Sequence, residues 1–282
     1  MSTDATQRIT PDFIGIGAPR CGTRWLAQCL EEHPQIALPA TEVYYFTRRR
    51  VVHPFWYRGY QWYENELRQC VTEQTKMVGE VTPVYLFDDD TPSLICNEAP
   101  NAKLICCVRD QAKRAESWYR LFLRFNPKLT ADTYPIEKFL TYQNDVFGRE
   151  GFYMEHLQRY LALFPRDQLL ILTVDELESC PLGFARQVFE FLGVDPTFVP
   201  PSVKRRINRL APEVRESAKR TESVSSMKQL VAHADSQEAV DALRMSAELR
   251  QQMHRLYFEH NQILGELLER DLTHWNTEQR GA

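Results

Sequence analysis

Three short, almost wholly apolar runs in this chain are each followed by an amphipathic helical pattern. The runs are residues 13–17 (FIGIG), 103–108 (KLICCV) and 168–174 (QLLILTV). Strands of a parallel sheet that is covered on both faces have this near-continuous apolar character, whereas strands with one wet face alternate. Strands that alternate with helices along the chain indicate an α/β fold. We therefore predict an α/β fold of three layers, in which a parallel sheet is flanked by helices.

The residues after each run have the spacing of an amphipathic helix. The first helix is expected to end before His33-Pro34, because proline disfavours a helical conformation at the preceding residue. After the second run, apolar side chains recur at i, i+3, i+7 and i+10, which predicts one apolar stripe. Its members are Ala115, Trp118, Phe122 and Phe125. The third helix is expected to end before Gly193, and a last helix is predicted over about residues 240–268.

The composition is that of an ordinary globular protein, since 43% of the 282 residues are hydrophobic and 26% are charged. We predict a single domain over residues 1–282. A basic segment over approximately residues 200–240 is expected to form a mobile loop and helix that cover the site. The net charge of −4 argues against nucleic acid as a partner.

The sequence shows no secretory signal, no membrane-spanning segment and no cysteine spacing typical of a zinc site. The opening residues, MSTDATQRITPD, have no apolar stretch typical of a secretory signal. The longest purely apolar runs have about five residues, whereas a membrane helix needs about 20. The seven cysteines include no CxxC pair, the spacing typical of zinc ligands. We expect a cytoplasmic protein with reduced thiols, no membrane association and no metal; the sequence leaves the oligomeric state open.

The segment between the first apolar run and its helix has the glycine spacing of a P-loop, GxxxxG, from Gly17 to Gly22. In a P-loop, backbone N–H groups and the helix N-terminus bind an anion. A Walker motif continues with Lys and then Ser or Thr, but Thr23 and Arg24 stand here, so the magnesium-binding hydroxyl is not in its place. Such a loop suits a donor whose leaving group is a phosphate and whose transferred group carries less charge than a phosphoryl group. A sulfuryl group fits this description, and a turn without any ligand is the alternative.

Six segments follow one another along most of the chain: APRCGTRWL, HPQI with TEVYYF, GEVTPVYL, CCVRDQAKRAESWYR, GFYMEHLQRYLALFP and LYFEHNQILGELLERDLTHW. In this order they resemble the sulfotransferases that use 3′-phosphoadenosine 5′-phosphosulfate (PAPS). The resemblance is greatest to the heparan-sulfate and other Golgi-type group and its bacterial relatives. It implies a P-loop-type parallel sheet and PAPS as co-substrate.

This resemblance assigns two groups of phosphate ligands. Arg109 and Ser117 would bind the 3′-phosphate; Arg109 ends a predicted strand and Ser117 lies two turns into the next helix, so both can face the crevice where α/β folds bind ligands. The residues expected at the 5′-phosphosulfate are Arg20, Cys21, Gly22, Thr23, Arg24 and Trp25. The basic run Lys204, Arg205 and Arg206 resembles a third nucleotide-contacting loop, with a solvated charge run as the alternative.

Glu42 matches the general base of the family. A solvated glutamate has a pKa of about 4.3, so the site is expected to raise this pKa or to hold the carboxylate close to the acceptor. The alternatives as base are His53, Glu80 and His33; both histidines precede a proline, and a structural role is expected for His33. Glu80 is also a candidate to orient Arg20 or the acceptor, and the candidates for contact with the acceptor are His53, Glu80 and Tyr45.

The sequence departs from the family pattern at two positions. Arg20 stands where the family usually has a lysine on the bridging oxygen. Arginine can stabilise the leaving phosphate by its charge but cannot donate a proton in the usual pH range, so its catalytic role would be electrostatic. Val81 stands where the most similar members have a lysine that serves a charged acceptor site. This second departure argues against a sulfated polysaccharide as acceptor.

The sequence thus predicts a metal-free, cytoplasmic and bacterial PAPS-dependent sulfotransferase. It would move a sulfuryl group to a hydroxyl or amine of a small-molecule or carbohydrate acceptor, with Glu42 as general base. A divergent P-loop kinase and a non-catalytic nucleotide-binding module on the same fold are the alternatives.

Overall fold

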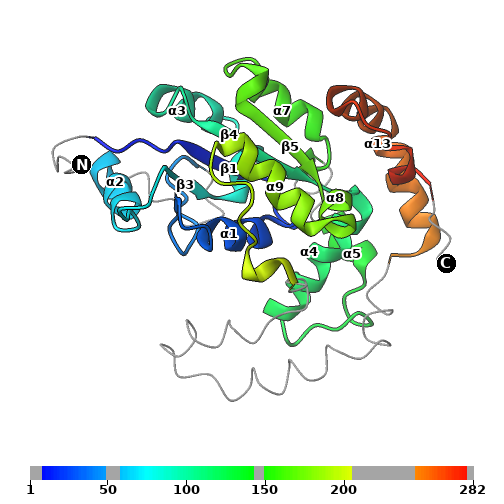
Figure 1. Ribbon diagram of the computed structural model, residues 1–282. Coiled ribbons are helices and arrows are strands. Elements are labelled where there is room, and N and C mark those ends of the chain that lie inside the picture. Colours follow the sequence, from blue (N-terminus) through cyan, green and yellow to red (C-terminus); the bar gives the residue numbers. More distant parts are fainter. Residues whose placement is uncertain (1–7, 49–57, 143–148, 205–244, 278–282) are drawn as a thin grey trace. The chain divides into compact units, whose positions relative to one another are not determined.

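The structure is a computed structural model that describes residues 8–48, 58–142, 149–204 and 245–277 (Figure 1). The chain forms two compact units. The first unit comprises Met1–Arg109 with Glu155–Arg206, and the second comprises Asp110–Met154 with Ile207–Ala282. Most of the predicted basic segment 200–240 lies outside the described residues.

The first unit contains a five-stranded sheet in the order β2-β3-β1-β4-β5, and all its strand pairs are parallel. Its strands are β1 (Phe13–Gly17), β2 (Ile36–Ala37), β3 (Met77–Val81), β4 (Lys103–Val108) and β5 (Leu169–Thr173). The three predicted strands are β1, β4 and β5, with bounds that agree to within one residue. Every residue of β1 is buried, as expected for a strand that is covered on both faces.

Helices cover both faces of this sheet, which confirms the predicted three-layer α/β class. On one side, α1 (Thr23–Glu31) packs on α9 (Pro181–Leu192), where Trp25 and Phe184 meet edge to face at 5.7 Å. On the other side lie α3 (Thr91–Glu98) and α7 (Tyr153–Leu161) (Figure 1). The remaining elements of the first unit are α2 (Tyr60–Arg68), α8 (Val174–Ser179) and the 3-10 helices η2 (Pro83–Phe87), η3 (Arg166–Gln168) and η4 (Pro201–Lys204).

Two predicted helix ends are confirmed. Helix α1 ends at Glu31, before His33-Pro34. Helix α9 ends at Leu192, and Gly193 follows with φ 78°, the left-handed conformation that glycine adopts without strain. The short helix α8 between β5 and α9 was not predicted.

The elements described in the second unit are helices. They are α4 (Gln111–Phe125), α5 (Ile136–Tyr142), α13 (Ala247–Leu268) and the 3-10 helix η6 (Thr273–Trp275). The core of this unit joins α4 to α5, and its buried members are Ala112, Ala115, Tyr119, Ile136, Phe139 and Met245. The predicted stripe on α4 is wrong at its last member, because Phe125 is 75% exposed where the helix ends.

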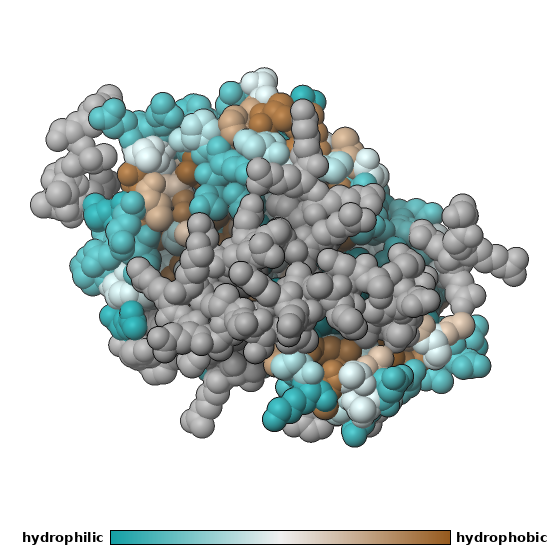
Figure 2. All heavy atoms as spheres, turned by 90° about the horizontal axis from the view of Figure 1, so that it is seen from below, coloured by the Kyte–Doolittle hydropathy of each residue, from teal (hydrophilic) through white to brown (hydrophobic). Residues whose placement is uncertain are grey.

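On the face drawn in Figure 2, hydrophobic residues are visible in several places beside hydrophilic ones. None of the helices in the described ranges combines the length and the apolar character that crossing a bilayer requires.

Candidate functional site

The phosphate-type loop lies where the sequence predicts it, between β1 and α1 at the carboxyl edge of the sheet. The loop approaches its neighbours closely: a Cβ added at Gly17 would lie 2.7 Å from the carbonyl oxygen of Pro83. Gly22 has φ 81°, and a Cβ there would lie 2.7 Å from Cδ2 of Leu177 on α8. Arg20 adopts the left-handed conformation as well, with φ 70°. Gly17 is therefore required by space, because the backbone oxygen of Pro83 leaves no room for a Cβ, and Gly22 is favoured by its left-handed conformation.

The N-terminus of α1 has the properties of an anion site. Gly22 is its N-cap residue, no side chain caps the helix, and its first turn contains no acidic residue. The N–H groups at a helix start lack partners within the helix, and the helix dipole favours negative charge there. Thr23 is buried and Arg24 is exposed in this first turn. The loop thus presents backbone donors together with an arginine, the combination that binds phosphate.

Two of the predicted ligands of the 5′-phosphosulfate point their side chains into the core. Cys21 is fully buried, and its thiol lies 3.7 Å from the carbonyl oxygen of Pro19. Trp25 is 5% exposed and packs on Phe184. The Cys21 N–H donates to the carbonyl oxygen of Ala18 at 3.2 Å, whereas the Trp25 N–H lies in the first turn of α1, where N–H groups lack partners within the helix.

Glu42 lies beside this loop. It follows β2, it is exposed, and its carboxylate accepts a hydrogen bond from the Tyr44 hydroxyl. Shielding from water by nearby protein atoms raises the pKa of Glu42, while the Tyr44 hydrogen bond and the positive charge of Arg24 act in the opposite direction. Arg24, in the first turn of α1, is thus near enough for its charge to act on the Glu42 carboxylate.

Glu80, at the end of β3, is a second carboxylate near the loop. It is 1% exposed and accepts hydrogen bonds from the hydroxyls of Thr82 (2.6 Å) and Tyr85 (3.1 Å). Burial raises the pKa of Glu80 to about 7, against the hydrogen bonds that lower it, and the negative charge of Glu42 raises it further. Because Glu80 is buried, it cannot contact an acceptor directly, contrary to one of the roles expected from the sequence. The Tyr63 hydroxyl is also buried near Glu80 and lowers the pKa of this carboxyl, although it makes no hydrogen bond of standard geometry.

Tyr45 belongs to an aromatic cluster beside Glu42. Its ring stacks on that of Tyr63 at 4.5 Å and meets Phe46 and Tyr60 edge to face. Tyr45 is half-buried: its ring packs against the cluster, and the rest of its surface is accessible to solvent. His53, the other acceptor candidate, lies outside the described residues.

His33 has a structural role, as expected. It is 1% exposed, its Nε2 lies 3.0 Å from the carbonyl oxygen of Asp195, and its Nδ1 accepts a hydrogen bond from the Gln35 N–H. Both ring nitrogens are therefore occupied, and His33 is excluded as a base.

Of the two predicted ligands of the 3′-phosphate, Arg109 belongs to the first unit. It follows β4 and forms an ion pair with Glu178 on α8, at 3.6 Å. The same short helix contacts the loop through Leu177, so Arg109 and the Gly22 turn both lie against α8. Ser117 belongs to the second unit, in α4, and is 7% exposed. Their joint action on one phosphate stays a prediction.

The basic run is only partly described. Lys204 is the last residue of η4, and Arg205 and Arg206 lie outside the described residues. Ser202 in η4 donates a hydrogen bond to Glu32, just past α1, which attaches the start of this segment near the end of that helix.

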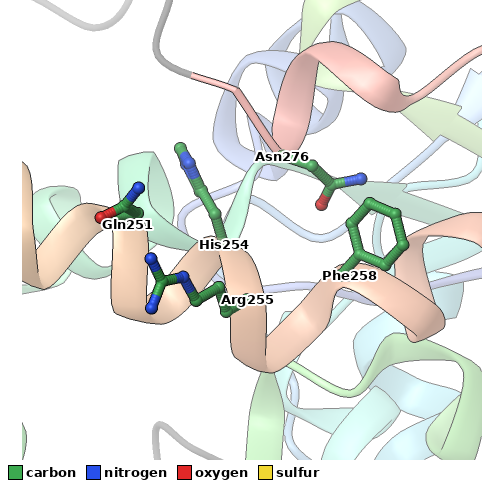
Figure 3. A pocket seen from close by; sticks show the side chains of 5 residues that line it. All are labelled: Gln251, His254, Arg255, Phe258 and Asn276. Atoms are coloured by element: carbon green, nitrogen blue, oxygen red, sulfur yellow. The ribbon is translucent and has the colours of Figure 1, made fainter.

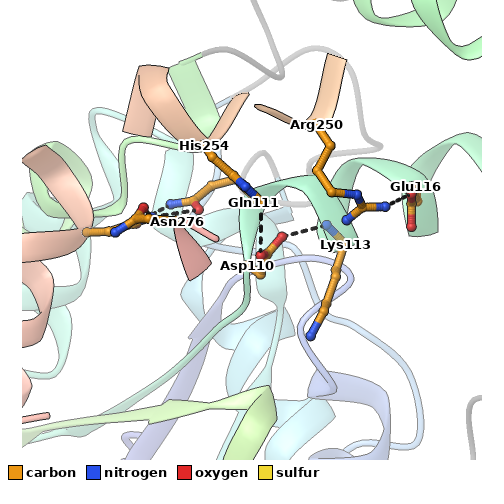
Figure 4. Close-up of polar contacts among 8 residues, drawn as sticks. Asp110, Gln111, Lys113, Glu116, Arg250, His254 and Asn276 are labelled. Atoms are coloured by element: carbon orange, nitrogen blue, oxygen red, sulfur yellow. Dashed lines mark hydrogen bonds and ion pairs between the residues drawn. The ribbon is translucent and has the colours of Figure 1, made fainter. Parts of the chain in front are cut away.

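A polar cluster in the second unit was not anticipated from the sequence (Figure 4). Asp110 caps α4 by accepting a hydrogen bond from the Lys113 N–H (2.8 Å), and Nε2 of the buried His254 on α13 lies 3.6 Å from the second oxygen of Asp110. Gln111 donates to Asn261 at 2.7 Å, and Glu116 pairs with Arg250. These contacts fasten α13 to the first turns of α4. An aspartate directly before a helical pattern is the N-cap signal that could have indicated Asp110.

One side of α13 borders an open pocket of about 360 Å³ (Figure 3). Its lining residues are Gln251, His254, Arg255, Phe258 and Asn276. Within the described ranges, no group of three or more His, Cys, Asp or Glu side chains is arranged to hold a metal ion.

Comparisons with known proteins give the family of this chain. The model of the sulfotransferase domain family matches residues 10–270. Mouse heparan sulfate glucosamine 3-O-sulfotransferase 3A1 is 30% identical over 200 residues, which are 68% of this chain and 48% of that protein. The mouse 3B1 enzyme is 31% identical over 193 residues, 65% of this chain and 46% of that protein. The chain therefore spans about half the length of these curated relatives.

Two solved structures have the same fold. A sulfotransferase from Alicyclobacillus acidocaldarius gives a TM-score of 0.72 at 22% identity, over 95% of this chain and 100% of that one. Mouse sulfotransferase SULT7A1, solved in complex with PAP, gives 0.52 at 18% identity, over 92% and 87% of the two chains. Since the family model covers nearly the whole sequence, this chain belongs to the sulfotransferase family.

Proposed function

We propose that this protein transfers a sulfuryl group from PAPS to a hydroxyl or amine of an acceptor, with Glu42 as general base. The observation that carries the proposal is the uncapped N-terminus of α1, whose first-turn Arg24 lowers the pKa of Glu42 by its positive charge. Donor and acceptor can react where an anion site and a base lie close together. Family membership favours this reaction over phosphoryl transfer by a divergent P-loop kinase.

In this reaction the acceptor oxygen or nitrogen attacks the sulfur atom. The bond between sulfur and the bridging phosphate oxygen breaks, and 3′-phosphoadenosine 5′-phosphate (PAP) leaves with the electron pair. The acceptor proton passes to Glu42. Arg20, Thr23, Arg24 and the loop N–H groups stabilise the charge that develops on the departing phosphate.

The acceptor is proposed as a carbohydrate or a small molecule. The names of the curated relatives favour a glucosamine-containing chain, because those enzymes act on heparan sulfate. Val81 favours an acceptor with less negative charge, because it replaces the family lysine and is 7% exposed. The aromatic surface around Tyr45 fits the apolar face of a sugar ring or a phenol. The cytoplasmic location and the bacterial origin expected from the sequence remain predictions.

The test is transfer of labelled sulfate from PAPS to heparan sulfate, to an unsulfated glucosamine-containing polysaccharide and to a phenol. We expect Glu42→Gln to lower turnover by about 10²- to 10⁴-fold, the usual contribution of a positioned base, with little change in PAP affinity. Glu73→Gln, an exposed carboxylate in the turn before β3, is the matched control. Unchanged turnover in Glu42→Gln would refute the assignment of the base. A protein that binds PAP and labels no acceptor would be the nucleotide-binding module instead.

A further inference from the structure

Two buried hydroxyl groups bind the backbone of the loop that carries Glu42. Oγ1 of Thr82 accepts hydrogen bonds from the backbone N–H groups of Val43 (3.1 Å) and Tyr44 (3.4 Å). The Tyr85 hydroxyl accepts one from the N–H of Phe46 (3.1 Å). Both hydroxyl-bearing residues are fully buried. Three of the four residues after Glu42 thus donate backbone hydrogen bonds to a side-chain hydroxyl, either of Thr82 or of Tyr85 in η2.

Both hydroxyls donate their hydrogen to the same carboxylate. Thr82 donates to Glu80 at 2.6 Å, and Tyr85 donates to it at 3.1 Å. A hydroxyl has one hydrogen and two lone pairs, whereas an ionised carboxylate can only accept. The carboxylate therefore directs both hydrogens toward itself, which leaves the lone pairs to accept the loop N–H groups.

The conformation of the loop explains why such support is needed. Tyr44 has φ 55°, a left-handed conformation that a residue with a side chain adopts at a cost. The same residue donates its hydroxyl hydrogen to the Glu42 carboxylate. Fixing the Tyr44 backbone therefore also fixes the partner that orients Glu42.

We propose that Glu80 and Thr82 are positioning residues, which orient the general base through the backbone of residues 43–46 without contacting the acceptor. This inference rests on the proposed function of Glu42. The buried carboxylate acts as the common acceptor that polarises the two hydroxyls, and the hydroxyls act as the anchor points of the loop. Burial raises the pKa of Glu80 to about 7, so the experiments are done at pH 8, where the carboxylate is mainly ionised.

The anchoring is tested without an acceptor by hydrogen–deuterium exchange. Thr82→Val keeps the side-chain shape and removes the hydroxyl, whereas Thr82→Ser keeps the hydroxyl. We expect amide exchange over residues 42–47 to become about five- to tenfold faster in Thr82→Val, the effect of losing a neutral hydrogen bond, and to stay near wild type in Thr82→Ser. Equal exchange in all three proteins, or an equal increase in β1 peptides of Thr82→Val, would overturn the inference.

Glu80→Gln tests the direction of the hydrogen bonds. The amide group is close in size to the carboxylate, but its NH₂ donates to one hydroxyl, which must then turn its own hydrogen toward the loop N–H groups. We expect faster exchange over residues 42–47 and a kcat about tenfold lower, with KM for PAPS unchanged. A raised KM with unchanged kcat would contradict a positioning role.

A double-mutant cycle separates this inference from the proposed function. If Thr82 acts through Glu42, Thr82→Val lowers turnover in the wild-type background and has no further effect in Glu42→Gln. A full additional loss in Glu42→Gln would overturn the inference while the base assignment stands. If Glu42→Gln alone leaves turnover unchanged, the base assignment fails, and the exchange data still decide whether Thr82 anchors the loop.

Discussion

Two glutamates near the phosphate loop have different surroundings, and these suit them to different roles. Glu42 is exposed, beside the positive charge of Arg24, and therefore accessible to an acceptor. Glu80 is enclosed by Thr82, Tyr85 and Tyr63 and has no access to solvent. Burial favours the neutral form of a carboxyl, and hydrogen-bond donors favour the ionised form. The role of each carboxylate thus depends on its neighbours and not on its residue type.

The raised pKa of Glu80 predicts how stability depends on pH. The folded protein holds this proton up to about pH 7, whereas the unfolded chain loses it near the ordinary glutamate pKa of about 4.5. Between these values the folded state binds more protons, so the free energy of unfolding falls as pH rises, by about 3 kcal/mol for this group. When the free energy of unfolding is measured with urea from pH 5 to pH 8, it should decline less steeply in Glu80→Gln than in wild type. Glu73→Gln is the control for the charge change. The same slope in Glu80→Gln and wild type would contradict the prediction.

At the scale of elements, the phosphate loop lies next to α8. Gly22 caps α1 in a left-handed conformation, and a Cβ there would lie 2.7 Å from Cδ2 of Leu177 on α8, whose side chain would have to shift. Arg109 reaches the same helix through Glu178. Helix α8 itself starts with a capping box, in which Thr173 and Glu176 satisfy each other's backbone N–H groups. A well-defined short helix therefore supports both the loop and the predicted 3′-phosphate arginine.

Gly22→Ala tests the left-handed conformation of Gly22, with Gly193→Ala as a matched control. Both glycines have a positive φ of about 80°, but a Cβ at Gly193 would meet nothing within 4 Å. Each substitution should cost about 1–2 kcal/mol of stability from backbone strain. Only Gly22→Ala should also weaken PAP binding, measured by calorimetry, because only Gly22 lies in the phosphate loop. Because the Leu177 side chain can shift, adding Leu177→Ala should change the affinity little; equal PAP affinity in Gly22→Ala and Gly193→Ala would show that the conformation of Gly22 is unimportant for binding.

At the scale of the whole molecule, the predicted phosphate ligands are divided between the two units. The loop, Glu42 and Arg109 belong to the first unit, and Ser117 belongs to the second, in which α4 and α13 are joined by buried polar contacts. If both Arg109 and Ser117 bind the 3′-phosphate, a nucleotide with that group should stabilise the protein more than one without it.

Thermal-shift titration compares PAP with adenosine 5′-phosphate, ADP and ATP. PAP at 100 times its dissociation constant should stabilise the protein by about 2.7 kcal/mol, and adenosine 5′-phosphate at the same concentration by far less. Arg109→Ala and Ser117→Ala should each reduce the response to PAP and leave the response to adenosine 5′-phosphate unchanged. Arg186→Ala, which changes a charge on α9, is the control for Arg109→Ala. Equal responses to PAP in all variants would remove both residues from the nucleotide site.

The parts of the fold that the sequence predicts are those with a strong local pattern. The strands β1, β4 and β5 are continuous apolar runs, and the end of α9 is marked by Gly193. Strand β2 has only two residues, and β3 contains a glycine and a buried glutamate, so neither has a clear apolar pattern. These two strands acquire their conformation from pairing with neighbours, which is a non-local interaction.

The candidate site, like the fold, has one part that the local sequence predicts and another part that it does not. The phosphate loop is readable from glycine spacing between an apolar run and a helix, because the loop, the strand and the helix are adjacent in sequence. The support of the Glu42 loop joins residues about 40 positions apart, as between Val43 and Thr82, and local sequence contains no signal for it. The sequence alone determined the sheet type, the anion loop and the family to which the chain is similar. Only the tertiary structure decided that Glu80 is enclosed, that Trp25 and Cys21 face the core and that Glu42 stands beside Arg24, because burial and proximity arise only when distant segments pack together.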